Sequence, residues 1–211
     1  MLASVIGRSN QNVYLQDSTG RFYAVPSHTL PSARGQGEPA SGKLNLPAGA
    51  TLTGMIMGED DKEVFVGTSA GYGFRTTITD LHTKNKAGKS VVKISPYAQV
   101  VQPKLIYDDN SLIVAVSNEG RMLVFDISNV PKLAKGKGNK IINIPSARLK
   151  RGEEWVVDYA IVGQGTSLLV YSGKRYLSLK YGDLEHYVGE RGRRGHKLPR
   201  GFQRVDYLKS E

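Results

Sequence analysis

Short runs of alternating or β-branched hydrophobic residues, separated by polar turns that contain glycine, recur along this chain. In the first example, between residues 12 and 25, the runs VYLQ and FYAV flank the turn DSTGR. Two such runs around a glycine are typical of a β-hairpin. Similar pairs of runs surround Gly71, Gly120 and Gly173. The pattern predicts four hairpins and little helix, with only short spots such as Tyr181–Tyr187 able to complete a turn or two.

The glycines of these turns (Gly20, Gly71, Gly120 and Gly173) are separated by about fifty residues, a spacing typical of repeated structural units. A unit of that length with four short strands has the size of a propeller blade. We therefore expect an all-β fold, a propeller-like ring of about four antiparallel blades. The predicted single domain contains repeats at roughly 1–52, 53–103, 104–152 and 153–211.

Each hairpin is followed by a polar stretch that a Leu or Val opens and a cluster of glycines and cations closes. Beyond each cluster a further pair of strands is predicted, such as Lys89–Ile94 with Val100–Tyr107 and Lys140–Ile144 with Trp155–Val162. Prolines such as Pro96 lie between these strands, where a missing N–H does no harm. The clusters therefore belong to the repeat.

The composition shows a large excess of basic over acidic residues. The 211 residues carry a formal net charge of +10, and the sequence pI is about 9.7. Such a field indicates a polyanionic partner, nucleic acid first and an anionic membrane surface second. The chain has no cysteine, which excludes disulfides and thiolate metal sites. No run of about twenty apolar residues is present, so we expect a soluble intracellular protein without a membrane partner.

The basic clusters are the main candidate for a binding surface. One cluster by itself would be interpreted as a solvated turn, but equivalent positions of a radial repeat lie on the same rim. The recurrence therefore predicts a belt of cations that holds duplex DNA by counterion release and favours bent DNA. The cluster residues are Arg34; Lys84, Lys86 and Lys89; Lys135, Lys137 and Lys140; and Arg191, Arg193 and Arg194.

Three other sites are weaker candidates. Residues 83–92, TKNKAGKSVV, nearly match a phosphate-binding P-loop, but Thr83 replaces the first glycine and a strand follows in place of a helix. A dinucleotide fingerprint at 136–141 fails because Ile141 occupies the third glycine position. Tyr176, next to Arg175, could suggest a nucleophile that cleaves DNA, but the repeat register favours packing on a blade.

The scattered histidines suggest no metal site, and His28 and His82 are expected to make local hydrogen bonds. Acidic pairs such as Glu153-Glu154 are interpreted as solvated turn residues. Without a recognition helix, zinc-finger spacing or a run of exposed aromatic residues, shape and charge should dominate binding over base recognition.

Several long segments together resemble a known family. The segments are HTLPSARGQGEP (28–39), SAGYGFRTTITDLHTKNKAGKSVV (69–92), GRMLVF (120–125), KGKGNKIINIPSA (135–147) and GERGRRGHKLPRGFQRVD (189–206). They closely resemble the C-terminal domain of the bacterial DNA topoisomerase IV A subunit, which is related to that of the gyrase A subunit. The resemblance covers nearly the whole chain.

This resemblance implies a β-pinwheel, a ring of four-stranded blades that exchange strands with their neighbours and is often open or broken. It implies a non-catalytic domain that bends DNA around a basic rim during decatenation and supercoil relaxation by a type IIA topoisomerase, an isomerase that serves chromosome segregation. No cofactor is implied for this chain, because ATP and Mg act in other regions of that enzyme. The implied partners are double-stranded DNA, the B subunit, and the rest of the A subunit, in the bacterial cytoplasm near the nucleoid.

Two departures from the family pattern qualify these expectations. The gyrase protein carries a box close to QRRGGKG, and all four clusters here are degenerate versions of it, which argues against strong chiral wrapping. The family domain usually begins with a further blade, so an N-terminal part of it, and the catalytic core, are expected to be absent from this chain.

The complete set of predicted DNA-binding residues adds cations that flank the clusters. It consists of Arg34, Lys43, Lys84, Lys86, Lys89, Lys93, Lys132, Lys135, Lys137, Lys140, Arg148, Lys150, Arg151, Arg191, Arg193, Arg194, Lys197 and Arg200. Two rival hypotheses remain open: a propeller that binds acidic protein partners through the same belt, and an enzyme acting on phosphate esters through Gly88-Lys89-Ser90.

Overall fold

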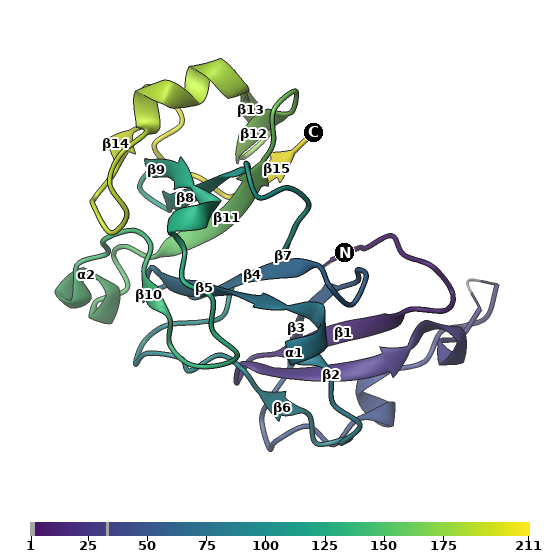
Figure 1. The fold of residues 1–211 in the computed structure, drawn as a ribbon. Helices are drawn as coiled ribbons and strands as arrows, with labels where there is room; N and C mark the ends of the chain where they lie inside the picture. The colour runs from purple at the N-terminus through teal and green to yellow at the C-terminus, as the bar shows by residue number, and fades with distance from the viewer. Residues whose placement is uncertain (1–2, 33) are drawn as a thin grey trace.

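Strands dominate the computed structural model, which describes residues 3–32 and 34–211 (Figure 1). The strands are β1 (Asn12–Asp17), β2 (Arg21–Pro26), β3 (Leu52–Ile56), β4 (Glu63–Gly67), β5 (Tyr72–Thr77), β6 (Lys89–Ser90), β7 (Lys104–Ile106), β8 (Leu112–Ser117), β9 (Arg121–Asp126), β10 (Asn139–Lys140), β11 (Val156–Val162), β12 (Ser167–Ser172), β13 (Arg175–Lys180), β14 (His196–Lys197) and β15 (Tyr207–Ser210).

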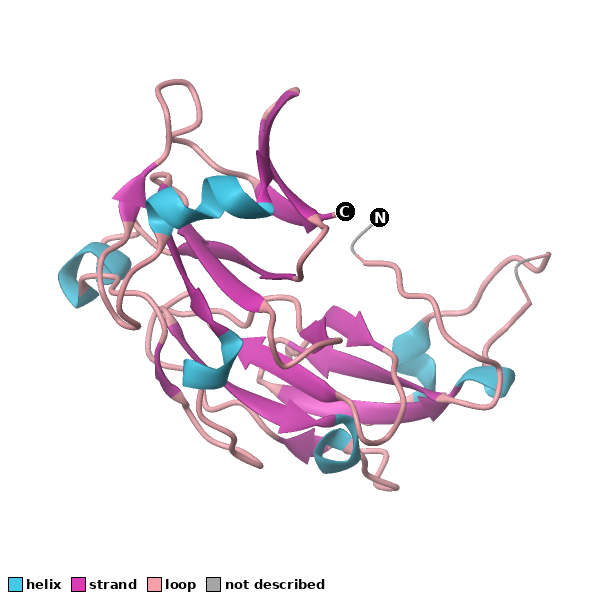
Figure 2. Cartoon of the chain, turned by 45° about the horizontal axis from the view of Figure 1, so that its top comes forward, coloured by secondary structure: helices cyan, strands magenta, loops and turns pink. Residues whose placement is uncertain are grey.

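Helical segments are short and connect the sheets (Figure 2). They are the α-helices α1 (Ile78–Leu81) and α2 (Ser146–Lys150) and the 3-10 helices η1 (Ser27–Thr29), η2 (Ala40–Lys43), η3 (Ile127–Asn129) and η4 (Tyr181–Tyr187). The last of these confirms the single helical spot that the sequence predicted. No helix of the described residues is long and apolar enough to cross a membrane.

The four predicted hairpins are the centres of four antiparallel sheets. The strand orders are β3-β1-β2-β6, β10-β5-β4-β7, β11-β8-β9-β14 and β13-β12-β15. The fold is thus the expected all-β pinwheel. The fourth sheet differs from the expectation, because it has three strands in the part of the chain that the structure describes.

Each of the first three sheets receives its outer strand from the next repeat. β6 follows the β4-β5 hairpin yet pairs with β2, β10 follows β8-β9 yet pairs with β5, and β14 follows β12-β13 yet pairs with β9. We call β6, β10 and β14 the exchange strands. They are only two residues long, so the longer strands predicted at Lys89–Ile94 and Lys140–Ile144 are wrong. Because each exchange strand continues the chain of one sheet and pairs with the sheet before it, neighbouring sheets are connected by the backbone as well as by packing.

The hairpin-turn glycines Gly20 and Gly71 are required by this exchange. Gly71 has a φ of +86°, and a Cβ atom there would lie 2.3 Å from the carbonyl oxygen of Ile142, just beyond β10. Gly20 is equivalent, because its Cβ would lie 2.2 Å from the Val92 carbonyl oxygen beyond β6. The left-handed backbone and the close approach both demand glycine. At Gly173 no exchange strand arrives, and nothing lies within 4 Å of an added Cβ.

The core is divided among the gaps between neighbouring sheets. One cluster, around Phe74 and Val91, lies between the first and second sheets, and another, around Phe65 and Tyr159, lies between the second and third. A third cluster, around Val170, joins the third and fourth sheets. Burial of these apolar faces fixes each blade against the next.

The arc of sheets does not close. No strand of the fourth sheet pairs with a strand of the first within residues 3–32 and 34–211. The edge strands β3, β7, β11 and β15 face a hollow of about 850 Å³, lined by residues such as Met55, Lys104 and Leu208. The exchange strands lie at the opposite sheet edges, on the outer rim (Figure 1).

Candidate nucleic-acid interface

The exchange strands position the basic clusters. Immediately before each one stands a glycine with positive φ: Gly88 (+73°), Gly138 (+78°) and Gly195 (+73°). A Cβ at Gly138 would lie 2.2 Å from the Gly73 carbonyl oxygen, and one at Gly195 would lie 2.5 Å from that of Met122. These glycines let the chain turn sharply against the preceding sheet, which places the cations of each cluster along the outer rim.

Backbone hydrogen bonds join each cluster to the next. The Lys93 N–H donates to the Gly136 carbonyl, and the Gly136 N–H donates to the Val91 carbonyl, each at 2.8 Å. One repeat further on, the Asn143 N–H donates to the Arg193 carbonyl at 2.9 Å. We call the resulting surface of residues 84–93, 135–143 and 191–197 the basic belt. The last three of the four predicted clusters are therefore continuous in space.

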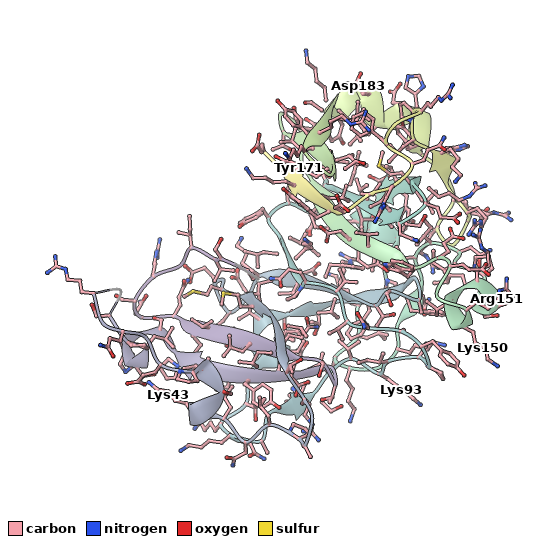
Figure 3. All side chains as sticks on the ribbon, turned by 180° about the vertical axis from the view of Figure 1, so that it is seen from behind. Lys43, Lys93, Lys150, Arg151, Tyr171 and Asp183 are labelled. Atoms are coloured by element: carbon pink, nitrogen blue, oxygen red, sulfur yellow. The ribbon has the colours of Figure 1, made fainter. Side chains whose placement is uncertain are left out.

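The first cluster stands apart from this series. Arg34 lies in the exposed loop between η1 and η2, and Lys43 ends η2. One backbone hydrogen bond of 2.9 Å, from the Asn45 N–H to the Lys86 carbonyl, connects the end of this loop with the basic belt. Figure 3 shows Lys93, Lys150 and Arg151 along one margin of the molecule, with Lys43 set apart from them.

The predicted DNA-binding residues divide into two groups, those that form an ion pair with a carboxylate and those that do not. Seven form ion pairs with carboxylates: Lys43, Lys132, Arg148, Arg151, Arg193, Arg194 and Lys197. Eleven have no carboxylate within ion-pair distance among the described residues: Arg34, Lys84, Lys86, Lys89, Lys93, Lys135, Lys137, Lys140, Lys150, Arg191 and Arg200. The basic belt holds eight of these eleven, which leaves its charge largely uncompensated.

Aromatic and backbone groups orient several cations of the belt. The Lys137 ammonium lies 4.0 Å from the centroid of the Tyr72 ring, and Lys140 lies 5.9 Å from it. The Arg191 guanidinium donates to the Lys140 carbonyl at 3.1 Å. A cation over an aromatic face or against a carbonyl keeps its charge, so it remains able to bind an anion.

An ion-pair network lies at the end of the belt. Glu154 is fully buried, with Oε1 3.0 Å from Arg194 Nη1 and Oε2 3.3 Å from Arg148 Nη1. The interpretation of Glu153-Glu154 as solvated turn residues is therefore wrong for Glu154. Arg148 also contacts Glu119 in a bidentate pair. The network ties α2 to the loop that carries Arg194 and so holds that loop against the third sheet.

Hydrogen bonds from guanidinium groups lower the pKa of two carboxyl groups in this network. The hydrogen bond from Arg148 lowers the pKa of Glu119 below its ordinary value of 4.5. The hydrogen bond from Arg151 likewise lowers the pKa of Glu153. Both carboxylates therefore stay ionised, and paired with their arginines, to a lower pH than an unpaired glutamate would.

One buried cation escaped prediction from the sequence. Arg75 is 8% exposed in β5, where Nη1 contacts Glu63 at 2.9 Å and Nε donates to the Val130 carbonyl at 2.8 Å. It anchors the segment that enters the third cluster. The sequence did contain a signal for this residue. The positions equivalent to Arg75 are Ala24 in the first hairpin and Val124 in the third, so an arginine stands where the other repeats have a small or apolar residue.

The other sites considered from the sequence have structural roles. Lys89, in the near-match to a P-loop, lies in β6 and donates from Nζ to the Asp80 carbonyl at 2.5 Å. His82 does form a hydrogen bond, but not the local one expected: Nδ1 lies 3.4 Å from the hydroxyl of Tyr14, which belongs to β1. Tyr176 lies on a blade as predicted: it belongs to β13, pairs with Tyr171 of β12 with ring centroids 5.7 Å apart, and is 59% exposed.

One turn beside the basic belt is strained. Tyr97 has a φ of +64° and is the only non-glycine residue with positive φ in the described part of the chain. It follows Pro96 in a turn closed by the Ala98 N–H and the Ser95 carbonyl at 3.1 Å. Proline followed by a residue with positive φ is typical of a type II turn, which favours glycine at the second of its two central positions, the one that Tyr97 occupies here. A tyrosine there costs about 1 kcal/mol or more.

A groove runs along the belt between the first two sheets. It has a volume of about 630 Å³ and is lined by Thr19, by residues 90–94 and by Lys135 and Gly136. Lys93 and Lys135 thus stand in the wall of one depression. Paired cations beside a groove can follow a phosphate backbone.

Comparison with protein families agrees with this architecture. The model of the DNA gyrase C-terminal domain, beta-propeller, matches residues 62–106 and 111–161. The E. coli ParC C-terminal domain superposes with a TM-score of 0.87 at 47% sequence identity, over 99% of this chain and 84% of that one.

Full-length relatives are much longer than this chain. The DNA topoisomerase 4 A subunit of Pseudomonas aeruginosa is 51% identical over 207 residues, which cover 98% of this chain and 28% of that protein. The corresponding protein of Escherichia coli K12 is 48% identical over 204 residues, covering 97% of this chain and 27% of its own length. The chain therefore spans less than a third of the length of these relatives.

Proposed function

Since this chain belongs to the family of C-terminal domains of the DNA topoisomerase IV A subunit, we propose that it binds double-stranded DNA along the basic belt and bends it. Binding is independent of sequence and rests on release of counterions from the phosphates. Bending follows from the arc of the rim, because a duplex must curve to reach cations of successive sheets.

The observation that carries this proposal is the continuity of the basic belt. Three clusters from three repeats are connected by backbone hydrogen bonds, and eight of their cations face no carboxylate among the described residues. Lysines and arginines that already pair with carboxylates gain less from a phosphate, because an existing partner must be displaced. We therefore assign the main contacts to the unpaired cations and a smaller contribution to the seven paired ones.

The place of this domain in a whole enzyme is part of the proposal. We propose that it captures DNA segments for a type IIA topoisomerase during decatenation and supercoil relaxation, together with the B subunit, and with the rest of the A subunit. Cleavage of DNA and the use of ATP and Mg belong to those other regions, and this domain contributes no catalytic group and needs no cofactor. Its location would be the bacterial cytoplasm, at the nucleoid.

Charge reversal at the third cluster tests the proposal. The triple variant Lys135→Glu, Lys137→Glu, Lys140→Glu removes three neighbouring cations of the belt and changes the net charge by six units. We expect duplex affinity to fall by about a hundredfold or more at moderate salt, since each lost phosphate contact removes released counterions. Affinity is measured by fluorescence anisotropy, and bending by energy transfer between dyes at the ends of the duplex.

The matched control reverses three lysines outside the belt: Lys62, Lys180 and Lys209. It changes the net charge equally, so a purely long-range field would weaken binding as much as the belt variant does. We expect the control to retain most of the affinity and all of the bending. Equal losses in the two variants would show that the overall charge of the chain, and not contact with the basic belt, determines the affinity.

A further inference from the structure

The strained turn at Tyr97 presents an aromatic side chain that the fold does not use. Its ring is 65% exposed, and its hydroxyl makes no hydrogen bond within the described residues. Glycine would occupy this left-handed position without strain. The chain thus retains a large, mostly exposed side chain at an unfavourable backbone position, outside the four hydrophobic core clusters. Strain of this kind is typical of functional sites.

The surroundings of Tyr97 are those of the basic belt. The Lys150 ammonium lies 5.9 Å from the centroid of its ring, at the end of α2. Lys93, four residues before Tyr97, is exposed and is hydrogen-bonded through its backbone to Gly136 of the next cluster. Figure 3 shows Lys93 and Lys150 projecting on the same margin of the molecule. Both lysines lack carboxylate partners among the described residues, and the ammonium of Lys150 is the one that approaches the Tyr97 ring.

The chemistry of this group fits a sugar-phosphate backbone. Two ammonium groups attract phosphates, a phenol hydroxyl donates to a phosphate oxygen, and a flat ring packs against the apolar face of a deoxyribose. Stacking on bases fits less well, because a base platform for single strands usually consists of several aromatic rings in a row.

We propose that Tyr97 is a DNA-contacting residue that binds the sugar-phosphate backbone of duplex DNA between Lys93 and Lys150. This inference rests on the proposed function and adds to it a contact that is not electrostatic. Its ring and hydroxyl hold the duplex at one point of the rim, whereas the lysines attract it along the whole belt.

Replacement by glycine separates the contact from the fold. Tyr97→Gly relieves the turn strain, so we expect the thermal midpoint to stay within about 2 °C of the parent or to rise. The same variant should bind a duplex about tenfold more weakly, and salt dependence should change little because no charge is lost. Tyr97→Phe keeps the ring without the hydroxyl and should fall between the parent and the glycine variant.

The control is Tyr107→Gly, which removes another exposed tyrosine. Tyr107 is 77% exposed but lines the inner hollow, away from the belt. We expect its duplex affinity to equal that of the parent. The assay uses one duplex of mixed sequence and a single strand of the same length as competing probe.

The outcomes distinguish this inference from the proposed function. Weaker duplex binding by Tyr97→Gly with an intact fold supports the inference. Unchanged binding by Tyr97→Gly, beside a parent that binds duplex DNA, overturns the inference and leaves the proposed function standing. A lower thermal midpoint in Tyr97→Gly would overturn it too, since the ring would then stabilise the fold. A larger effect on the single strand than on the duplex would contradict the backbone contact. A parent that binds no duplex would overturn the proposed function itself.

Discussion

Single residues of this domain show how similar cations acquire different roles. Arg75 and Arg194 each pair with a carboxylate that has little exposure to water, Glu63 and Glu154, and each holds a segment of chain in place. Lys93 and Lys135 face only solvent and a groove. The difference is local: an acidic partner within reach turns a cation into a structural element, and without one the cation remains available for an external anion.

Glu154 provides a test of this division. Glu154→Gln keeps the shape of the side chain but leaves Arg148 and Arg194 facing a neutral amide at a fully buried position. We expect the free energy of unfolding to fall by about 2–3 kcal/mol, somewhat less than for a wholly buried pair because both arginines are partly exposed. Chemical denaturation at neutral pH measures this change.

The control for this variant is Glu185→Gln, on the exposed face of η4. It makes the same chemical change at a side chain that forms no ion pair in the described part of the chain, and we expect no change beyond about 0.5 kcal/mol. A similar loss in the two variants would mean that Glu154 does not organise the network.

At the scale of elements, the exchange strands decide where the basic clusters lie. Each is two residues long, and its pairing depends on a glycine that turns against the preceding sheet. Such short strands gain little from their own hydrogen bonds. Apolar residues that follow them, such as Val92 and Ile142, fill the gaps between sheets and stabilise the connection.

Gly138 is one position at which a single methyl group would disturb this connection. Gly138→Ala would force a Cβ to within 2.2 Å of the Gly73 carbonyl oxygen and a side chain into a backbone with a φ of +78°. We expect a loss of about 2–4 kcal/mol in the free energy of unfolding, because neither the strand nor the carbonyl can move freely. Thermal and chemical denaturation measure it.

Gly42→Ala serves as the matched variant. Nothing lies within 4 Å of a Cβ at Gly42, and its φ is not in the left-handed region. Stability should remain within about 0.5 kcal/mol of the parent. If Gly138→Ala were equally neutral, exchange strand β10 would contribute nothing to the fold.

The sequence predicts these elements to different degrees. The hairpins around Gly20, Gly71, Gly120 and Gly173 were predictable because alternating residues and a turn glycine are local signals. The partners of the exchange strands were not, because β6 pairs with a strand almost seventy residues earlier in the chain and carries no hydrophobic alternation of its own. The resemblance to a family supplied the exchange, which the residue pattern alone did not contain.

The candidate site shows a similar limit. Recurrence of the clusters predicted a shared rim, and the hydrogen bonds between the last three clusters agree with it. Which cations pair with carboxylates depends on contacts such as Arg148 with Glu119, twenty-nine residues apart, that no local pattern reveals. The strain at Tyr97 is likewise a property of backbone geometry, although the preceding Pro96 hinted at a turn.

For the molecule as a whole, the arrangement of sheets separates two surfaces. The inner edges of the sheets face the hollow, and the outer edges carry the exchange strands and the basic belt. The chain has a net charge of +10, and eight cations without a carboxylate partner among the described residues lie together on the outer rim. An open arc of this kind offers a curved, positively charged track to an anionic polymer.

The salt dependence of duplex binding tests the role of this track most directly. The affinity of the chain for a duplex of mixed sequence is measured by anisotropy between about 50 and about 200 mM salt. If the belt neutralises phosphates, the logarithm of the association constant falls linearly with that of the salt concentration, with a slope of about −5 or steeper. The Lys135, Lys137 and Lys140 charge-reversal variant should show a shallower slope. An affinity that stays constant across this range, or no measurable binding at its low end, would contradict DNA binding by the basic belt.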